Sequence, residues 1–316
     1  MGGRLSQTHG KKYDDSVDAK VPRDTMHWHC ETSGFTIYSG SQLFWKGRAM
    51  DNRFTPRRIA AGILNRTSRK LAHTARMIED PTLRDIVRRG MPRESCETLG
   101  KKWLRDMDFQ TVLDVGANVG QFATAARAIL PDATIYSFEP LPDCFLELER
   151  RMSRTGKFRA FNVGLGADRG ELQFNRSSFA PSSSFRKMAA LHKQNYPWTV
   201  GSEPVNVKVE TLDGLAATLD LVDPILLKID VQGYEDRVLA GGKATCSRAA
   251  AIIVEVSFET LYEGQPLFDD IYRSLTGMGF VYKGDLDETA ERKTGRNLYA
   301  DAIFLRPTSS GAGAGC

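Results

Sequence analysis

The 316-residue chain has no long hydrophobic run, and none approaches the ~20 apolar residues that a membrane-spanning helix needs. The N-terminal stretch MGGRLSQTHGKKYDD also lacks the apolar core of a signal peptide. The five cysteines are scattered, and an odd number cannot complete a disulfide framework. These absences predict a cytoplasmic protein without a membrane span.

Clustered metal ligands are missing as well. The run HWHC at 27–30 has a metal-binding composition, but no second ligand pair is spaced to complete a site. We therefore expect no metal. The sequence carries no signal for an oligomeric state.

Charge is distributed unevenly along the chain. Residues 1–110 hold 21 Lys and Arg against 13 Asp and Glu, whereas the remainder holds 22 against 26. The basic residues lack the interleaved aromatic side chains of a nucleic-acid platform, so we expect no nucleic-acid partner. A solvated helical face is the simpler interpretation of the basic segment, and weak peripheral contact with an anionic membrane is the alternative.

Four regions follow from composition and pattern. Residues 1–50 are rich in Gly, Ser, Thr and His and are expected to form a flexible leader. Residues 51–108 form a basic helical extension, with apolar residues at helical spacing over 56–78 and a further helix starting at Ser95. A single α/β domain is expected over 109–306, and 307–316 should be a disordered tail.

Short apolar runs alternate with helical patterns from residue 111 onward. The expected strands are 111–115, 134–140, 158–163, 224–230, 250–257, 279–284 and 301–306, with extra strands at 171–174 and 205–212. Helices are expected over 119–130, 141–152, 233–242 and 266–279. This alternation predicts a doubly wound, mostly parallel sheet.

The stretch LDVGANVG, residues 113–120, joins the first strand of this domain to a helix. Ligands of open α/β sheets bind at such carboxyl ends of strands. A dinucleotide site has the pattern GxGxxG, but here Asn118 replaces the middle glycine between Gly116 and Gly120. Asp114 just before the turn would repel a pyrophosphate and would suit a ligand with a cationic end, such as S-adenosylmethionine. Capping of the following helix is the structural alternative for Asp114.

Glu139 ends the second strand, 19 residues after Gly120. An acidic residue at this place can accept hydrogen bonds from both hydroxyls of a ribose. A carboxylate at the start of the next helix is the structural alternative. Asp114 and Glu139 together indicate a nucleoside ligand more strongly than either does alone.

Several motifs in order along the chain resemble the FkbM family of S-adenosylmethionine-dependent methyltransferases. They are VLDVGANVGQF, YSFEP, NVGLGADRGEL, ETLDGL, LLKIDVQGYEDRVLAGG, IIVEVSFETLYEGQPLF and ADAIFLR. The resemblance covers about residues 95 to 306, and the runs KIDVQGYE and EVSFETLY are the most specific to the family.

The resemblance implies a Rossmann-like class I methyltransferase fold, with seven strands, the last of them antiparallel. It also implies O-methylation of a small-molecule or glycan acceptor: a sugar, a polysaccharide or a natural product. By position, the methionine half of S-adenosylmethionine would be held by Asp114, Gly116, Ala117, Asn118 and Gly120, the ribose by Glu139 beside Pro140, and the adenine by Asn162 and its neighbours. Gly164 departs from the alanine that the family more often has there.

Transfer of a methyl group to a hydroxyl requires a base near the end of the fourth strand. Asp230 is the first candidate, and capping of the next helix is its structural alternative. Lys228 lies two residues earlier, so it is expected on the same side of the strand and in contact with Asp230. Glu235 is the second candidate, although a carboxylate in a first helical turn is often structural. Glu255 could be functional or structural.

The long Ser-rich insertion at about 175–204 holds His192, a third candidate base. Its aromatic residues Phe185, Tyr196 and Trp198 predict a lid over the acceptor, and an ordinary packed excursion is the alternative.

Two other functions stay open from the sequence. One is an NAD-type oxidoreductase on the same sheet, against which the missing glycine and Asp114 argue. The other is a non-catalytic module that keeps the cofactor pocket only.

Overall fold

The computed structural model describes residues 29–30, 35–36 and 93–307, and the chain divides into units 1–70 and 71–316. In the first unit, β1 (His29–Cys30) pairs with β2 (Phe35–Thr36) in an antiparallel ladder. The predicted leader at 1–50, apart from these two strands, and the predicted helix over 56–78 lie outside the described residues, as does most of the tail at 307–316.

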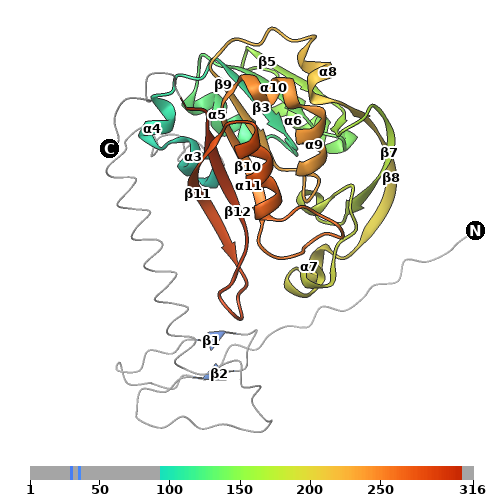
Figure 1. Ribbon diagram of the computed structural model, residues 1–316. Helices are drawn as coiled ribbons and strands as arrows, with labels where there is room; N and C mark the ends of the chain where they lie inside the picture. Colours follow the sequence, from blue (N-terminus) through green and yellow to red (C-terminus); the bar gives the residue numbers. More distant parts are fainter. Residues whose placement is uncertain (1–28, 31–34, 37–92, 308–316) are drawn as a thin grey trace, which may run out of the picture. The chain divides into compact units, whose positions relative to one another are not determined.

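A seven-stranded sheet forms the second unit (Figure 1). Its order is β11 (Val281–Ala290), β12 (Asn297–Leu305), β10 (Ala249–Ser257), β9 (Ile225–Ile229), β3 (Thr111–Val115), β4 (Thr134–Phe138) and β5 (Phe158–Phe161). Neighbours from β10 to β5 pair in parallel, and β12 is antiparallel to both β10 and β11. The predicted seven-stranded, mostly parallel sheet with an antiparallel last strand is confirmed.

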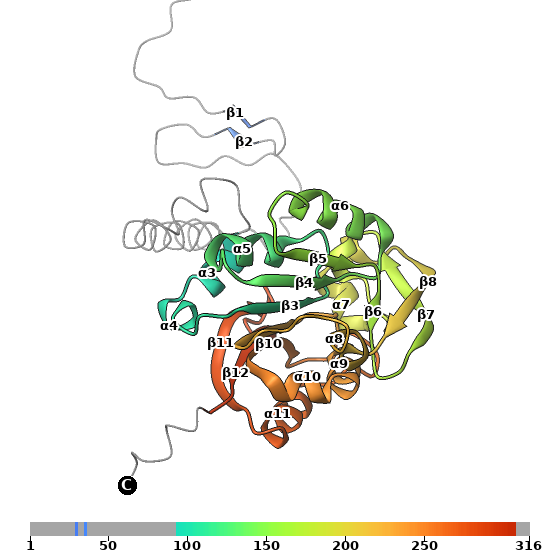
Figure 2. The same cartoon turned by 90° about the horizontal axis from the view of Figure 1, so that it is seen from above.

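Helices cover both faces of the sheet (Figure 2). One face carries α3 (Arg93–Leu99), α5 (Gln121–Ile129) and α6 (Pro142–Met152), whereas the other carries α8 (Leu212–Ala216), α9 (Glu235–Gly241), α10 (Lys243–Arg248) and α11 (Phe268–Gly277). A short α4 (Lys102–Arg105) follows α3. The helix expected to start at Ser95 is therefore two short helices, with Ser95 inside the first of them and Gly100 between them.

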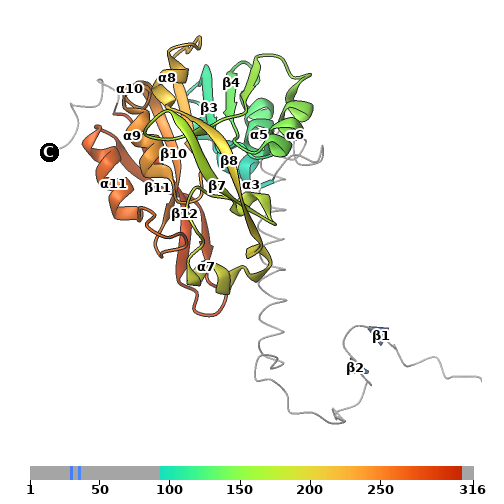
Figure 3. The ribbon, with the colours of Figure 1, turned by 90° about the vertical axis from the view of Figure 1, so that its right-hand side faces the viewer.

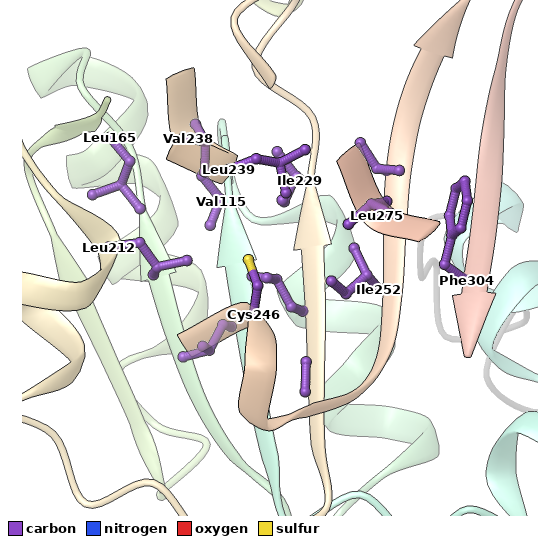
Figure 4. Close-up of a cluster of buried hydrophobic side chains, with 14 of the residues drawn as sticks. Val115, Leu165, Leu212, Ile229, Val238, Leu239, Cys246, Ile252, Leu275 and Phe304 are labelled. Atoms are coloured by element: carbon purple, nitrogen blue, oxygen red, sulfur yellow. The ribbon is translucent and has the colours of Figure 1, made fainter. Parts of the chain in front are cut away.

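The strands β3 and β9 are apolar on both sides because both faces of the sheet are covered. Val112 and Leu226 point to the side of α3 and α5, and Val115 and Ile229 point to the opposite side. Figure 4 shows this second cluster, where α9 and α11 pack on the sheet. The core fixes the sheet and leaves the carboxyl ends of β3, β4 and β9 along one edge.

A second, three-stranded sheet holds β6 (Gly164–Leu165), β8 (Ser202–Glu210) and β7 (Gly170–Ser177). Between β7 and β8 the chain forms the 3-10 turn η1 (Ala180–Ser182), α7 (Ala190–Asn195) and the 3-10 turn η2 (Pro197–Thr199). Because β7 runs to Ser177 and β8 starts at Ser202, the insertion spans 178–201 and is shorter than expected. Figures 1 and 3 place α7 at the same end of the molecule as the β11–β12 hairpin.

Gly120 has a packing role at the start of α5. It caps α5 with φ of 88°, and a Cβ built there would lie 2.8 Å from Cδ1 of Leu148 on α6. The glycine therefore allows α6 to approach the turn.

We expect Gly120→Ala to lower the free energy of unfolding by about 2–3 kcal/mol, since it combines left-handed strain with overpacking. Gly156→Ala is the control, because Gly156 has φ of 61° and nothing lies within 4 Å of its Cβ position. The control should cost only about 1 kcal/mol. Urea denaturation of both variants measures the difference, and equal costs would contradict the contact with Leu148.

Candidate active site

A cavity of about 300 Å³ lies where the first two parallel strands and β9 end. Its walls come from Gly116–Asn118 after β3, Glu139–Leu141 after β4 and Asp230–Gln232 after β9. The cavity therefore lies at the carboxyl ends of the strands, where the sequence predicted a ligand site.

The turn after β3 folds back onto the protein's own backbone. Gly116 has φ of 81°, and a Cβ built on it would lie 1.8 Å from the carbonyl oxygen of Asp230. No other residue fits there. Because residue 116 is glycine, the turn after β3 packs directly against the loop that carries Asp230.

Backbone N–H groups in this turn are already satisfied within the protein. Five consecutive donors are used: Gly116 and Ala117 to the carbonyl of Phe138 at 3.0 and 3.1 Å, Asn118 to Oε2 of Glu139 at 2.8 Å, Val119 to Oδ1 of Asn118 at 2.7 Å, and Gly120 to the carbonyl of Ala117 at 2.9 Å. A pyrophosphate needs such donors free. The turn is thus unsuited to the dinucleotide alternative.

Glu139 stands at the centre of this arrangement. Its side chain is 5% exposed, and Oε1 accepts a second backbone N–H, from Leu141, at 2.8 Å. Burial raises the pKa of Glu139 to about 7, against the lowering effect of its two N–H donors. Glu139 lines the cavity, where its remaining lone pairs are able to accept hydroxyl hydrogens.

Asp114 does not line the cavity, contrary to the expected direct contact with a ligand. It is fully buried in β3, in register with Ser137 of β4 and Lys228 of β9. The Lys228 Nζ lies 3.7 Å from Oδ1, and Ser137 donates to Oδ2 at 3.3 Å. Burial raises the pKa of Asp114, and the ammonium opposes that shift. Nor does Asp114 cap α5, whose N-cap Gly120 has no side-chain bond.

One end of the cavity is apolar, and it includes two of the expected neighbours of Asn162 but not Asn162 itself. Val163, Gly164 and Phe185 line it, whereas the exposed Asn162 instead donates to the carbonyls of Glu139 and Pro140 at 2.9 and 3.0 Å. A Cβ on Gly164 would lie 2.6 Å from the Phe185 ring. The glycine at this position therefore admits the ring.

Asp230 also lines the cavity, with its side chain 32% exposed. Lys228 Nζ contacts its Oδ2 at 3.1 Å, which is the pairing that the sequence predicted. Burial alone would lower the pKa of Lys228, but the carboxylates of Asp230 and Asp114 raise it overall. Lys228 is the one cation among the described residues that line the cavity, beside carboxylates of Asp230, Asp287 and Asp301.

Sequence reasoning missed Gln232. Its Nε2 donates to Oδ1 of Asp230 at 2.9 Å and to both oxygens of Glu255 at 3.1 and 3.2 Å. The Tyr262 hydroxyl lies 2.8 Å from Oε1 of Gln232 and 3.1 Å from the Ser182 carbonyl oxygen, the two acceptors of its one hydrogen. The position of Gln232, two residues after Asp230 and directly before Gly233, is the sequence signal that could have pointed to a role at this site.

Glu255 lies behind Asp230, at the end of β10. Burial, together with the charges of Asp230, Glu235 and Asp301, raises its pKa well above the usual range. Glu255 also does not line the cavity, so it fits a supporting position.

The cavity does not include the other two candidate bases. Glu235 is 3% exposed, and its Oε1 accepts the N–H groups of Val231 and Gly233, each at 3.1 Å. Burial raises its pKa to about 7. Glu235 therefore braces the loop after β9 instead of facing a ligand.

His192 is also buried away from the cavity, at 3% exposure between the rings of Tyr196 and Tyr262. Its Nε2 lies 3.2 Å from the Thr199 hydroxyl, and burial lowers its pKa to about 4. A weakly basic, enclosed imidazole is poorly suited to general-base catalysis.

The insertion contributes differently from the expected acceptor lid. Ala180, Pro181, Ser183 and Phe185 line the cavity, and Phe185 belongs to its apolar end. Tyr196 packs on His192, and Trp198 is 57% exposed. Only the first part of the insertion covers the cavity.

The described residues contain neither a cluster of metal ligands nor a membrane-spanning helix. Over 29–30, 35–36 and 93–307, no group of three His, Cys, Asp or Glu side chains is arranged to hold a metal ion. Helices in these described ranges are too short or too polar to cross a membrane.

Comparison with known proteins finds a matching family model and several relatives. The model of the methyltransferase FkbM domain matches residues 114–282. The chain is 31% identical to the 2-O-methyltransferase NoeI of Sinorhizobium fredii (49% of this chain, 66% of the relative) and 29% identical to the hexuronic acid methyltransferase AglP of Haloferax volcanii (45% and 54%). It is 28% identical to the 31-O-demethyl-FK506 methyltransferase FkbM of Streptomyces tacrolimicus (56% and 74%). The matches to NoeI and AglP thus span less than two thirds of those relatives' lengths.

Removing the Lys228 ammonium should be costly because two carboxylates depend on it. We expect Lys228→Met to lower the free energy of unfolding by about 3–5 kcal/mol, and Asp114→Asn added to it to restore part of that loss. Chemical denaturation gives both values.

Lys208→Met is the matched control, since Lys208 also pairs with a strand carboxylate, Glu210, but is 65% exposed. The control should cost no more than about 1 kcal/mol. Similar losses in the two lysine variants would show that Lys228 is not essential to the buried charge balance.

Proposed function

The chain belongs to the family of FkbM-domain methyltransferases, and we propose that it transfers the methyl group of S-adenosylmethionine to a hydroxyl of a sugar, polysaccharide or natural-product acceptor. The observation that carries this proposal is the Asp230 carboxylate in the wall of a cavity that Glu139 and the apolar residues Val163 and Phe185 also line.

The cavity residues fit S-adenosylmethionine by their chemistry. The apolar end, with Val163, Gly164 and Phe185, suits an adenine, and Glu139 is placed to accept ribose hydroxyl hydrogens. The carboxylates near Asp230 suit the ammonium and sulfonium groups of the methionine end. When bound, the group supplies an electrophilic methyl carbon on a sulfonium.

The chain's own residues supply orientation and proton removal. Asp230 accepts the proton of the acceptor hydroxyl at its carboxylate, and it is held by Lys228 at 3.1 Å and Gln232 at 2.9 Å. Glu255 lies behind it, joined to it through Gln232, and Glu235 accepts backbone N–H groups of the loop. Segment 180–185 covers the cavity and limits the entry of water.

The turn after β3 and Glu139 also argue against the oxidoreductase alternative. The pyrophosphate of a dinucleotide would need the N–H groups of the turn, which already donate within the protein. The Glu139 carboxylate, which accepts from the Asn118 N–H, would also repel it. Family membership supports the same choice.

An acceptor with sugar character is supported by relatives whose names specify a hexuronic acid and a 2-O position. We further propose that residues 109–306 form the catalytic domain, with 51–108 as a basic extension able to contact a membrane surface peripherally and 1–50 as a leader. The cytoplasmic location stays a prediction of the sequence.

Titration calorimetry with S-adenosylhomocysteine, followed by transfer of labelled methyl from S-adenosylmethionine to a panel of neutral sugars, hexuronic acids and macrolides, tests the function. Asp230→Asn should keep the affinity for S-adenosylhomocysteine and lower kcat at least about 100-fold, because it removes the proton acceptor. His192→Asn is the control and should leave kcat unchanged. Full turnover by Asp230→Asn would reject Asp230 as the base, and binding without transfer to any acceptor would favour the non-catalytic module.

Affinity for S-adenosylhomocysteine should depend on pH through Glu139. Because the pKa of Glu139 is raised to about 7, the carboxylate that accepts ribose hydroxyl hydrogens forms only as the pH rises through that value. Affinity should therefore increase from pH 5.5 to 8 by about tenfold and then level off. Glu139→Gln should bind about 1–3 kcal/mol more weakly with a flat profile. A wild-type profile as flat as that of the variant would contradict the role of Glu139.

A further inference from the structure

Gln232 occupies a backbone conformation that a residue with a side chain rarely adopts. Its φ is 57°, and that of the following Gly233 is 89°. A left-handed conformation costs a non-glycine residue about 1–2 kcal/mol. The surrounding contacts must therefore hold Gln232 in place.

These contacts fix the loop from two directions. From α9, Glu235 accepts the N–H groups on both sides of Gln232, those of Val231 and Gly233. From the insertion, the Ser184 hydroxyl donates to the Gln232 carbonyl at 2.7 Å. The backbone at Gln232 is thus held independently of its side chain.

The side-chain amide of Gln232 then joins two carboxyl groups through one nitrogen. It has two hydrogens on Nε2, and Asp230 at 2.9 Å and Glu255 at 3.1 Å accept them. An amide is uncharged, so it donates to both groups without adding a charge to a site that already contains several carboxyls.

Tyr262 supports the orientation in which Nε2 of the amide faces the carboxyl groups. Its hydroxyl lies 2.8 Å from Oε1 of Gln232 and 3.1 Å from the Ser182 carbonyl oxygen, the two acceptors of its one hydrogen, and its ring is buried at 2% exposure. The opposite orientation of the amide would set Oε1 against Asp230 and Glu255, which is unfavourable. Tyr262 and the carboxyl groups therefore favour the same orientation.

Asp230 is consequently held on both of its oxygens. Lys228 contacts Oδ2 at 3.1 Å and Gln232 contacts Oδ1, while about a third of the side chain (32%) stays exposed to the cavity. Lys228 alone would allow the carboxylate to turn about its Cβ–Cγ bond, and the second donor restricts that rotation.

We propose that Gln232 is a positioning residue, which with Tyr262 behind it holds the Asp230 carboxylate toward the point where the methyl group is transferred. This inference rests on the proposed function, and it goes beyond it by assigning the orientation of the base to an amide from the same loop. Gln232 acts through Asp230 and does not itself remove the proton.

Sinefungin tests this without knowledge of the acceptor. In this stable analogue a C–NH3+ group replaces the S+–CH3 group of S-adenosylmethionine, so its ammonium reports a carboxylate at the transfer point. S-adenosylhomocysteine lacks any group there. The ratio of the two affinities, measured by calorimetry, therefore isolates the contact with Asp230.

We expect wild-type protein to bind sinefungin about tenfold more tightly than S-adenosylhomocysteine, which is the effect of one charged hydrogen bond. Asp230→Asn should abolish this preference. Gln232→Met, which keeps the length but removes the donors, should reduce it several-fold and leave the affinity for S-adenosylhomocysteine unchanged. Tyr262→Phe should reduce it in the same direction, and it keeps the proposal testable should Gln232→Met not fold.

Gln173→Met is the matched control, because Gln173 is exposed on β7, outside the cavity. The control should retain the full preference. An unchanged preference in both Gln232→Met and Tyr262→Phe, or no preference in the wild type, would overturn the positioning role. Failure of the wild type to bind S-adenosylhomocysteine would instead reject the proposed function, and the inference with it.

Discussion

The Lys228 ammonium is the charge on which the catalytic edge of the sheet depends. It lies between Asp114, which is fully buried in the neighbouring strand, and Asp230, which faces the cavity. A buried carboxylate without a cation is strongly destabilising, so the core and the cavity share one counter-ion. The same pairing determines what a ligand meets: Asp114 is already compensated inside the protein, and Asp230 presents the accessible carboxylate.

Close backbone contact couples the two loops that would hold the donor and the base. Gly116 touches the Asp230 carbonyl, and the N–H of Asp230 donates to the carbonyl of Val115 at 3.0 Å. The turn after β3 and the loop after β9 are therefore a single rigid unit. A methyl donor bound to one would be set in a fixed position relative to Asp230 on the other, which is the alignment that transfer to a hydroxyl requires.

Buried carboxyl groups in this region have separate tasks because their surroundings differ. Glu139 and Glu235 each accept two backbone N–H groups and hold loops, whereas Glu255 is surrounded by like charges and tends to be neutral. Asp230 alone among these four has a lysine and an amide on its two oxygens together with access to the cavity. Differences of environment between similar side chains thus separate the structural groups from the candidate base.

Local pattern was sufficient to determine the sheet, the cofactor edge and the two acidic residues at strand ends. Alternation of short apolar runs with amphipathic helices requires a covered parallel sheet, and the positions of Gly116, Glu139 and Asp230 after strands 3, 4 and 9 follow from chain order alone. The family was also evident from the motifs. The short helices α8 and α10 were not predicted, because such elements have too few turns for a periodic signal.

Only the tertiary structure decided which side chains reach the cavity. Sequence spacing does not reveal that Asp114 is in register with Lys228, that His192 is enclosed by Tyr196 and Tyr262, or that Asn162 turns away while Phe185 enters over Gly164. Gln232 was missed for the same reason, since its partners Glu255 and Tyr262 are 23 and 30 residues distant in the chain. Contacts between distant residues depend on how strands and loops pack, and a one-dimensional pattern contains the elements but not their packing.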